Sequence, residues 1–163
     1  MEIKGNQLHW GGFSVEFLAR KYGTPLYVYD AKVIRERYRN IVDNIKYPYL
    51  KIHYAIKANS NPAILRLLKK EGAHVESVSQ GSVLLAFKAG FKPHQIIYTC
   101  NGAEENELKF LAENGIRINA DSLSQLEKWG QISPGSKVGL RLNLDLHAGS
   151  HAHLRTGGKR SKF

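Results

Sequence analysis

The sequence predicts an α/β fold, a partial (β/α)8 TIM-type barrel with about five βα units, from three observations. Short runs rich in β-branched and aromatic residues alternate with amphipathic helical segments. These units repeat roughly every 20 to 25 residues. Glycines and capping residues stand at the unit boundaries. Serial units of this length predict parallel strands, because a helix must carry the chain back before the next strand begins.

The chain before the repeat is predicted to form an amino-terminal arm and entry strand over residues 1–30. A short helix is predicted over Val15–Tyr22, ending at Gly23, and a strand over Pro25–Tyr29. Asp30 is expected to cap a helix that runs from Ala31 to about Ile45. Its apolar face is formed by Val33, Ile34, Tyr38, Ile41 and Val42.

The repeat itself begins after residue 50. Strands are predicted at 51–56, 73–78, 95–99, 116–119 and 137–142, and helices at 62–71, 80–89, 104–114 and 122–130. Gly90, Gly115 and Gly130 are expected to end three of these helices. A complete barrel usually takes about 250 residues. We therefore interpret the sequence as part of a longer enzyme, or as a chain that needs a partner to cover its open strand edges.

Composition narrows the function classes. The 163 residues are 42% hydrophobic, which suits a globular domain, and Cys100 is the single cysteine, which excludes a disulfide framework. There is no apolar leader or membrane-length apolar run, so we expect a cytoplasmic protein with no membrane partner. The net charge of +10 raises nucleic-acid binding as an alternative. We expect no nucleic-acid partner, because most of the charge is scattered over predicted helix faces. A denser cluster comprises Arg155, Lys159, Arg160 and Lys162.

Lys57 is the first candidate for chemistry. It follows the predicted strand 51–56 and precedes the turn Asn59–Pro62, in which Asn61 is expected to cap the next helix. In barrel enzymes the carboxyl ends of the strands carry the active site. A lysine there can act as a nucleophile towards a carbonyl once its pKa is lowered. The alternative is an ordinary exposed lysine.

The residues around Lys57 carry a family resemblance. Tyr54-Ala-Ile-Lys57-Ala-Asn59, followed by Ile64, Leu65, Leu68 and Gly72, resembles the pyridoxal phosphate attachment signature of the ornithine/diaminopimelate/arginine decarboxylase group. These are fold type III enzymes with an alanine-racemase-like barrel. Further segments that resemble this group are Tyr22–Asp30, His74–Gly81, Ala120–Ser122, Arg141–Asn143 and the tail Gly149–Phe163, and the tail is most similar to the diaminopimelate branch.

The resemblance implies a function and a site. It implies that residues 31–163 are the amino-terminal portion of a pyridoxal phosphate-binding barrel, with Lys57 as catalytic and cofactor-holding residue and Glu76 and Arg141 beside the cofactor. The implied reaction is decarboxylation of meso-diaminopimelate to L-lysine by a homodimer. The alternatives are decarboxylation of another basic amino acid and a non-catalytic relative that retains only the lysine chemistry. A structural salt bridge is the competing interpretation of Arg141.

Two residues depart from the family pattern. Glu76 stands where the family usually has aspartate, and Ser82 stands where a glutamate usually follows the glycine. A longer acidic side chain at Glu76 keeps the negative charge. Ser82 either removes a charge near the cofactor or simply helps to start a helix, as serine commonly does. We expect the 163-residue chain alone to be an inefficient decarboxylase, because other functional parts of the family follow in later barrel strands.

Three histidines form the remaining cluster. His147, His151 and His153 have the spacing H-x3-H-x-H, which suits zinc or nickel. They lie in a glycine-rich stretch, and Asp145 is the one carboxylate close to them in sequence. We predict no metal site and interpret the stretch as a loop that meets substrate or solvent.

Overall fold

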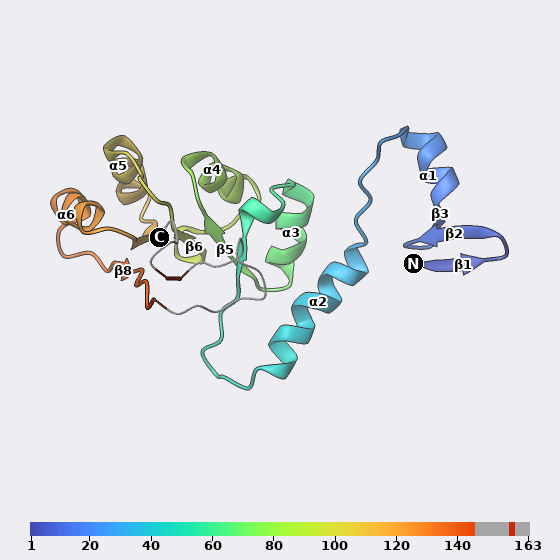
Figure 1. Cartoon of the computed structure of the whole chain (residues 1–163), viewed down its shortest axis with the longest axis horizontal. Coiled ribbons are helices and arrows are strands. Elements are labelled where there is room, and N and C mark those ends of the chain that lie inside the picture. Colours follow the sequence, from blue (N-terminus) through green and yellow to red (C-terminus); the bar gives the residue numbers. More distant parts are fainter. Residues whose placement is uncertain (146–156, 159–163) are drawn as a thin grey trace.

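The structure is a computed structural model that describes residues 1–145 and 157–158. Its centre is a five-stranded sheet with the strands in sequence order, β4-β5-β6-β7-β8, and each neighbouring pair is parallel (Figure 1). The strands are β4 (His53–Ala55), β5 (His74–Ser77), β6 (Ile96–Tyr98), β7 (Arg117–Ala120) and β8 (Gly139–Leu140). An open doubly wound sheet would reverse its strand order at a switch point. The unreversed order confirms the predicted partial barrel.

Helices connect the strands as predicted. They are α3 (Pro62–Lys70), α4 (Gln80–Lys88), α5 (Glu105–Glu113) and α6 (Leu123–Ile132), and short 3-10 turns occur at η1 (Ile56–Ala58) and η2 (Pro93–Gln95). The predicted stop at Gly130 is wrong, because α6 continues through it to Ile132. The burial of Trp129, which is 3% exposed, and the packing of Ile132 on the core outweigh the cost of a glycine within a helix.

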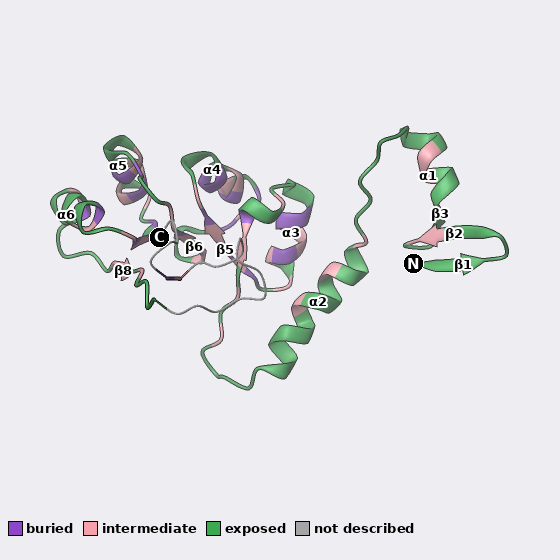
Figure 2. Cartoon of the chain, in the orientation of Figure 1, coloured by how far each residue is buried: buried purple, intermediate pink, exposed green. Residues whose placement is uncertain are grey.

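Alternation along the strands separates two faces of the sheet. Val75, Ile96 and Ile118 are at most 2% exposed and pack in one core with Val83, Leu108 and Leu111 of the helices. Figure 2 shows the buried residues on the strands and on the helix faces turned towards them. The intervening residues in the strands or directly after them, such as Glu76, Thr99 and Asn119, are only half-buried. Helices therefore cover one face of the sheet. The other face, which we call the open face, is left partly exposed and could line a functional site.

Capping side chains begin the helices. Asn61 Oδ1 accepts a hydrogen bond from the N–H of Ala63 at 2.9 Å, and Pro62 is the first residue of α3, as predicted. Asp30 Oδ1 accepts from the N–H of Lys32 at 2.8 Å at the start of α2 (Ala31–Asn44), which confirms the predicted cap. Each cap satisfies a backbone donor that has no partner within its helix.

The amino-terminal part forms a unit that the sequence reasoning had only partly resolved. An antiparallel sheet of β1 (Glu2–Lys4), β2 (Gln7–Trp10) and β3 (Phe13–Ser14) precedes α1 (Val15–Tyr22), and Figure 1 shows this unit well away from the parallel sheet. The helix α1 and its end at Gly23 are confirmed. The strand predicted over Pro25–Tyr29 is wrong. Within the described residues that segment pairs with no strand, and Tyr27 is 86% exposed.

Ion pairs attach α2 to the barrel portion. Arg39 donates to Glu71 through Nε at 2.6 Å and through Nη2 at 3.2 Å, and Arg35 Nε lies 3.4 Å from the same carboxylate. The Glu71 side chain is 11% exposed. The predicted apolar face of α2 reaches the core at Ile34 and Tyr38, which pack against Ile64 and Leu68. Among the described helices, none has the length and apolar character needed to cross a membrane.

Candidate functional site

Lys57 lies at the carboxyl end of β4, in the η1 turn that directly follows the strand. The preceding residue, Ile56, is 1% exposed and anchors the turn in the core, whereas Lys57 itself is exposed. The next strands of a parallel sheet end at the same edge. The exposed amine of Lys57 therefore stands at the edge where a barrel fold gathers its functional groups.

Two hydrogen bonds hold the segment that carries Lys57. The Tyr54 hydroxyl donates to the carbonyl of Asn59 at 3.2 Å, and Asn59 Oδ1 accepts from the N–H of Asn61 at 2.9 Å. Burial raises the pKa of the Tyr54 hydroxyl, which keeps it protonated as the donor. The bonds join β4 to the cap of α3 across the turn. Lys57 thus extends from a turn that hydrogen bonds hold in place.

Glu76 is placed one strand away. In the β4–β5 ladder its register partner is Ala55, two residues before Lys57. Glu76 is half-buried on the open face of the sheet, and it forms no ion pair among the described residues. The structure therefore places Glu76 on the strand next to the one that Lys57 directly follows.

Arg141 follows the strand at the opposite edge. Its N–H donates to the carbonyl of Ala120 at 2.8 Å, which extends the β7–β8 ladder by one bond. Because β5, β6 and β7 separate β8 from β4, this sheet does not bring Arg141 beside Lys57. Both residues nevertheless belong to the carboxyl edge of the sheet.

Beyond β8, Asn143 pairs with the backbone of Gly158. Its Nδ2 donates to the Gly158 carbonyl at 3.2 Å, and its Oδ1 accepts from the Gly158 N–H at 3.0 Å. The two bonds hold Gly158, which is buried, close to the end of β8. Asn143 therefore joins Gly158 to this part of the strand-end edge.

Sequence reasoning missed a histidine pair on the open face. His53 and His74 are register partners, and their rings meet edge to face with centroids 5.0 Å apart. Partial burial lowers the pKa of both imidazoles, and the positive charges near His74 lower the pKa of that ring further. The signal in the sequence was that each histidine lies near the start of a predicted strand, 51–56 or 73–78.

Ser82 has a structural role at the start of α4. Its Oγ accepts hydrogen bonds from the N–H groups of Val78 at 3.1 Å and Ser79 at 3.0 Å, while Ser79 Oγ accepts from the N–H of Ser82 at 3.2 Å. This reciprocal arrangement is a capping box, in which the third helical residue is most often glutamate or glutamine. The departure at Ser82 therefore keeps the helix cap.

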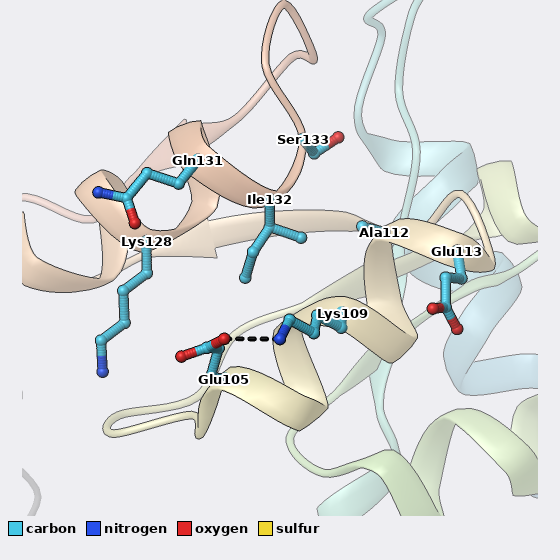
Figure 3. A pocket seen from close by; sticks show the side chains of 8 residues that line it. All are labelled: Glu105, Lys109, Ala112, Glu113, Lys128, Gln131, Ile132 and Ser133. Carbon is cyan, nitrogen blue, oxygen red and sulfur yellow. Dashed lines mark ion pairs between the residues drawn. The ribbon is translucent and has the colours of Figure 1, made fainter.

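Two pockets differ in whether they adjoin the carboxyl edge of the sheet. One of about 570 Å³ lies between α5 and α6 on the outer layer, where Glu105 and Lys109 form an ion pair at 2.6 Å (Figure 3). Its lining residues all come from that helical layer and the turn after it. The other, of about 510 Å³, is bounded by α2, β4 and α3, and Ala58 and Asn59 of the Lys57 segment line it. Only the second adjoins the candidate site.

The prediction that the three histidines form no metal site lies outside the described residues. His147, His151 and His153 lie outside them, as do Arg155, Lys159, Arg160 and Lys162 of the basic cluster. The tail Gly149–Phe163 is described only at residues 157–158. Within residues 1–145 and 157–158, no group of three or more His, Cys, Asp or Glu side chains is arranged to hold a metal ion.

Comparison with known proteins points to one family. A model of the pyridoxal binding domain of pyridoxal-dependent decarboxylases matches residues 31–163. A diaminopimelate decarboxylase of Methanothermobacter thermautotrophicus is 44% identical over 98% of this chain and 38% of its own length. One from Aquifex aeolicus is 35% identical over 100% of this chain and 40% of its own length. The chain therefore spans about two fifths of these relatives.

Solved structures agree with these relatives. The crystal structure of diaminopimelate decarboxylase from M. jannaschi matches with a TM-score of 0.88 and 30% identity, over 99% of this chain and 40% of that one. The Helicobacter pylori enzyme complexed with L-lysine matches with a TM-score of 0.84 and 33% identity, over 91% and 39% of the two chains. The similarity thus covers the sheet, its helices and the site edge together.

Proposed function

The chain belongs to the pyridoxal-dependent decarboxylase family, and from this membership we propose that it provides the cofactor attachment site of a diaminopimelate decarboxylase. The observation that carries the proposal is the placement of Lys57, an exposed amine in a fastened turn at the carboxyl end of β4. The proposed reaction is the decarboxylation of meso-diaminopimelate to L-lysine, and its relatives bear that enzyme's name.

The residues at the strand ends fit pyridoxal phosphate chemically. The aldehyde of that cofactor requires a primary amine that solvent and ligand can reach, and Lys57 presents one. When bound, pyridoxal phosphate accepts the electron pair left on the substrate α-carbon as the carboxylate departs. We assign Lys57 Nζ two tasks: to hold the cofactor covalently, and to move a proton once the substrate amine has taken its place.

Glu76 and Arg141 are assigned supporting tasks. Glu76 offers a carboxylate on the strand next to Lys57, on the open face of the sheet, and so keeps a negative charge beside the amine. Arg141 offers a cation at the end of β8 that would orient an anionic or ring group of the ligand. In a closed barrel the strands of both edges face one interior, which would put these two residues around one ligand.

The finer assignments follow from the family in the same way. We propose that residues 31–163 are the pyridoxal-binding portion and that residues 1–30 are an arm preceding it. We also propose a cytoplasmic homodimer as the working form. Because the chain spans 38% of the Methanothermobacter relative, we expect no efficient turnover of meso-diaminopimelate by the purified 163-residue chain. Efficient release of carbon dioxide from that substrate by this chain would contradict that expectation.

A cofactor titration tests the attachment site. Pyridoxal phosphate would be added to the wild-type chain and to Lys57→Ala, and binding would be followed by the visible absorbance of the protein-bound cofactor. Lys51→Ala is a matched control, since Lys51 is an exposed lysine at the other end of the same strand segment. We expect binding by wild type and Lys51→Ala and its loss in Lys57→Ala. Equal binding by all three folded proteins would overturn the proposal.

A further inference from the structure

The last strand of the sheet, β8, contains only Gly139 and Leu140. Its ladder with β7 pairs Asn119 with Gly139 and Ala120 with Leu140, and the N–H of Arg141 adds a bond to the Ala120 carbonyl. So short a ladder offers few bonds to choose one register over another. Something besides backbone pairing must select the register, since a slip along β7 would move Arg141 along the site edge.

The Asn119 side chain lies against the backbone of Gly139, and this contact selects the register. A Cβ atom added at Gly139 would overlap Asn119 Oδ1 and lie 3.1 Å from Asn119 Cγ. The backbone of Gly139 does not have a positive φ, so its conformation does not require glycine. The other residues from Lys137 to Arg141 all carry a Cβ atom. Only Gly139 fits opposite Asn119 as that side chain lies.

Thr99 holds the Asn119 side chain in place. Asn119 Nδ2 donates to Thr99 Oγ1 at 3.0 Å across the β6–β7 pair, which turns Oδ1 towards Gly139. Both side chains are half-buried on the open face of the sheet. The carboxamide could make room for a Cβ atom only by rotating away from Thr99 and losing this hydrogen bond. The Asn119 carboxamide is therefore held between Thr99 and Gly139.

The same face carries the proposed site residues. Ile97 is the register partner of both Glu76 and Arg117. Asn119 lies two residues after Arg117 in β7, and Thr99 lies two residues after Ile97, directly beyond the end of β6. Side chains two residues apart in a strand share a face. By the same rule Arg141 shares the face of Gly139, two residues before it. Glu76, Thr99, Asn119, Gly139 and Arg141 thus lie on one face of the sheet, with Glu76 two residues before the level of Asn119 and Gly139, and Arg141 two residues after it.

We infer that Asn119 is a positioning residue: bonded to Thr99 and seated over Gly139, it sets the register of β8 and thereby the place of Arg141. The value of this placement for the cofactor rests on the role proposed above for Arg141. The placement itself does not, because it follows from the contacts among β6, β7 and β8.

Amide hydrogen exchange in the 163-residue chain tests this inference without any cofactor. In Gly139→Ala the Arg141 amide, which bonds to Ala120, should exchange about tenfold faster, the effect of losing roughly one hydrogen bond. Gly130→Ala is the matched control, since no atom lies within 4 Å of a Cβ added there. Asn119→Ala, which removes the side chain that selects the register, should likewise speed exchange at Arg141. Equal exchange at Arg141 in Gly139→Ala and Gly130→Ala would overturn the inference.

A second pair of variants keeps the test decisive if Gly139→Ala unfolds the chain. Thr99→Val removes the acceptor for Asn119 and should speed exchange at Arg141, whereas Thr99→Ser keeps a hydroxyl and should retain slow exchange. Identical exchange in the two variants would also overturn the inference. Pyridoxal phosphate affinity is then measured in the same variants. Faster exchange with unchanged affinity upholds the register assignment and contradicts only the role of Arg141 under the proposed function.

Discussion

Ala55 of β4 pairs with Glu76 of β5 in a parallel ladder, and Ala55 lies two residues before Lys57 in the chain. This pairing puts a half-buried carboxylate on the strand next to Lys57. The Tyr54–Asn59 hydrogen bond fastens the turn between them and the next helix. The site therefore rests on the register between β4 and β5 and on the local hydrogen bonds of the turn.

Core packing beneath this turn should dominate stability. Leu65 of α3 is fully buried, so Leu65→Ala is expected to lower the free energy of unfolding by about 2 to 5 kcal/mol through the lost burial and the cavity left behind. Leu123→Ala makes the same chemical change at a residue that is 80% exposed, and we expect little effect there. Urea unfolding monitored by circular dichroism measures both. Similar losses in the two variants would refute this description of the core.

The cap of α4 gives a second prediction. Ser82→Ala removes the acceptor for the N–H groups of Val78 and Ser79 and should cost about 1 to 2 kcal/mol of unfolding free energy. Ser82→Glu restores the residue most often found at this position of a capping box and should recover most of that loss. Thermal and urea unfolding of the three proteins compares them. If Ser82→Ala is as stable as wild type, the capping role assigned to Ser82 is wrong.

The His53–His74 pair predicts acid sensitivity. Burial lowers the pKa of both rings in the folded chain below the ordinary value of 6.5, so the unfolded chain binds protons more readily as the pH falls. Their contribution to stability is present above that ordinary value and is lost as the pH falls through the folded-state pKa. The charged groups around the pair are Lys51, Glu76, His94 and Arg117, of which only Glu76 favours the protonated rings over this range.

Unfolding free energies measured from about pH 7.5 down to about pH 5 would test this sensitivity. His74→Phe keeps a ring against His53 but removes one proton site, and it should flatten the decline. A pH profile of His74→Phe that matches wild type over this range would show that the pair does not cause it.

Much of the barrel portion could be predicted from the sequence because its signals are local. Alternation in the strand segments, the Asn61-Pro62 cap and the regular spacing of the units all act within a few residues, and each is present in the structure. The antiparallel sheet over residues 2–14 was missed, although Gly5 and Asn6 between alternating residues were an available hairpin signal. Pro25–Tyr29 has strand composition, but a strand also needs a neighbour to pair with.

The site was predictable only in part for a similar reason. Lys57 is marked by the residues next to it in the chain. Other contacts depend on the register between segments about 20 residues apart. They are the pairing of His53 with His74 and the contacts of Asn119 with Thr99 and Gly139. Registers of that kind are set by the packing of the whole sheet, so the pattern within one segment does not contain them.

The most direct test of the central claim is to locate the cofactor on the chain. Pyridoxal phosphate is bound to the purified protein, the linkage is reduced with borohydride, and the modified peptide is identified by mass spectrometry, with circular dichroism to verify the fold. We predict a single modified lysine, Lys57, in the peptide that joins β4 to α3. Modification spread over the exposed lysines, or concentrated on a lysine other than Lys57, would contradict the assignment.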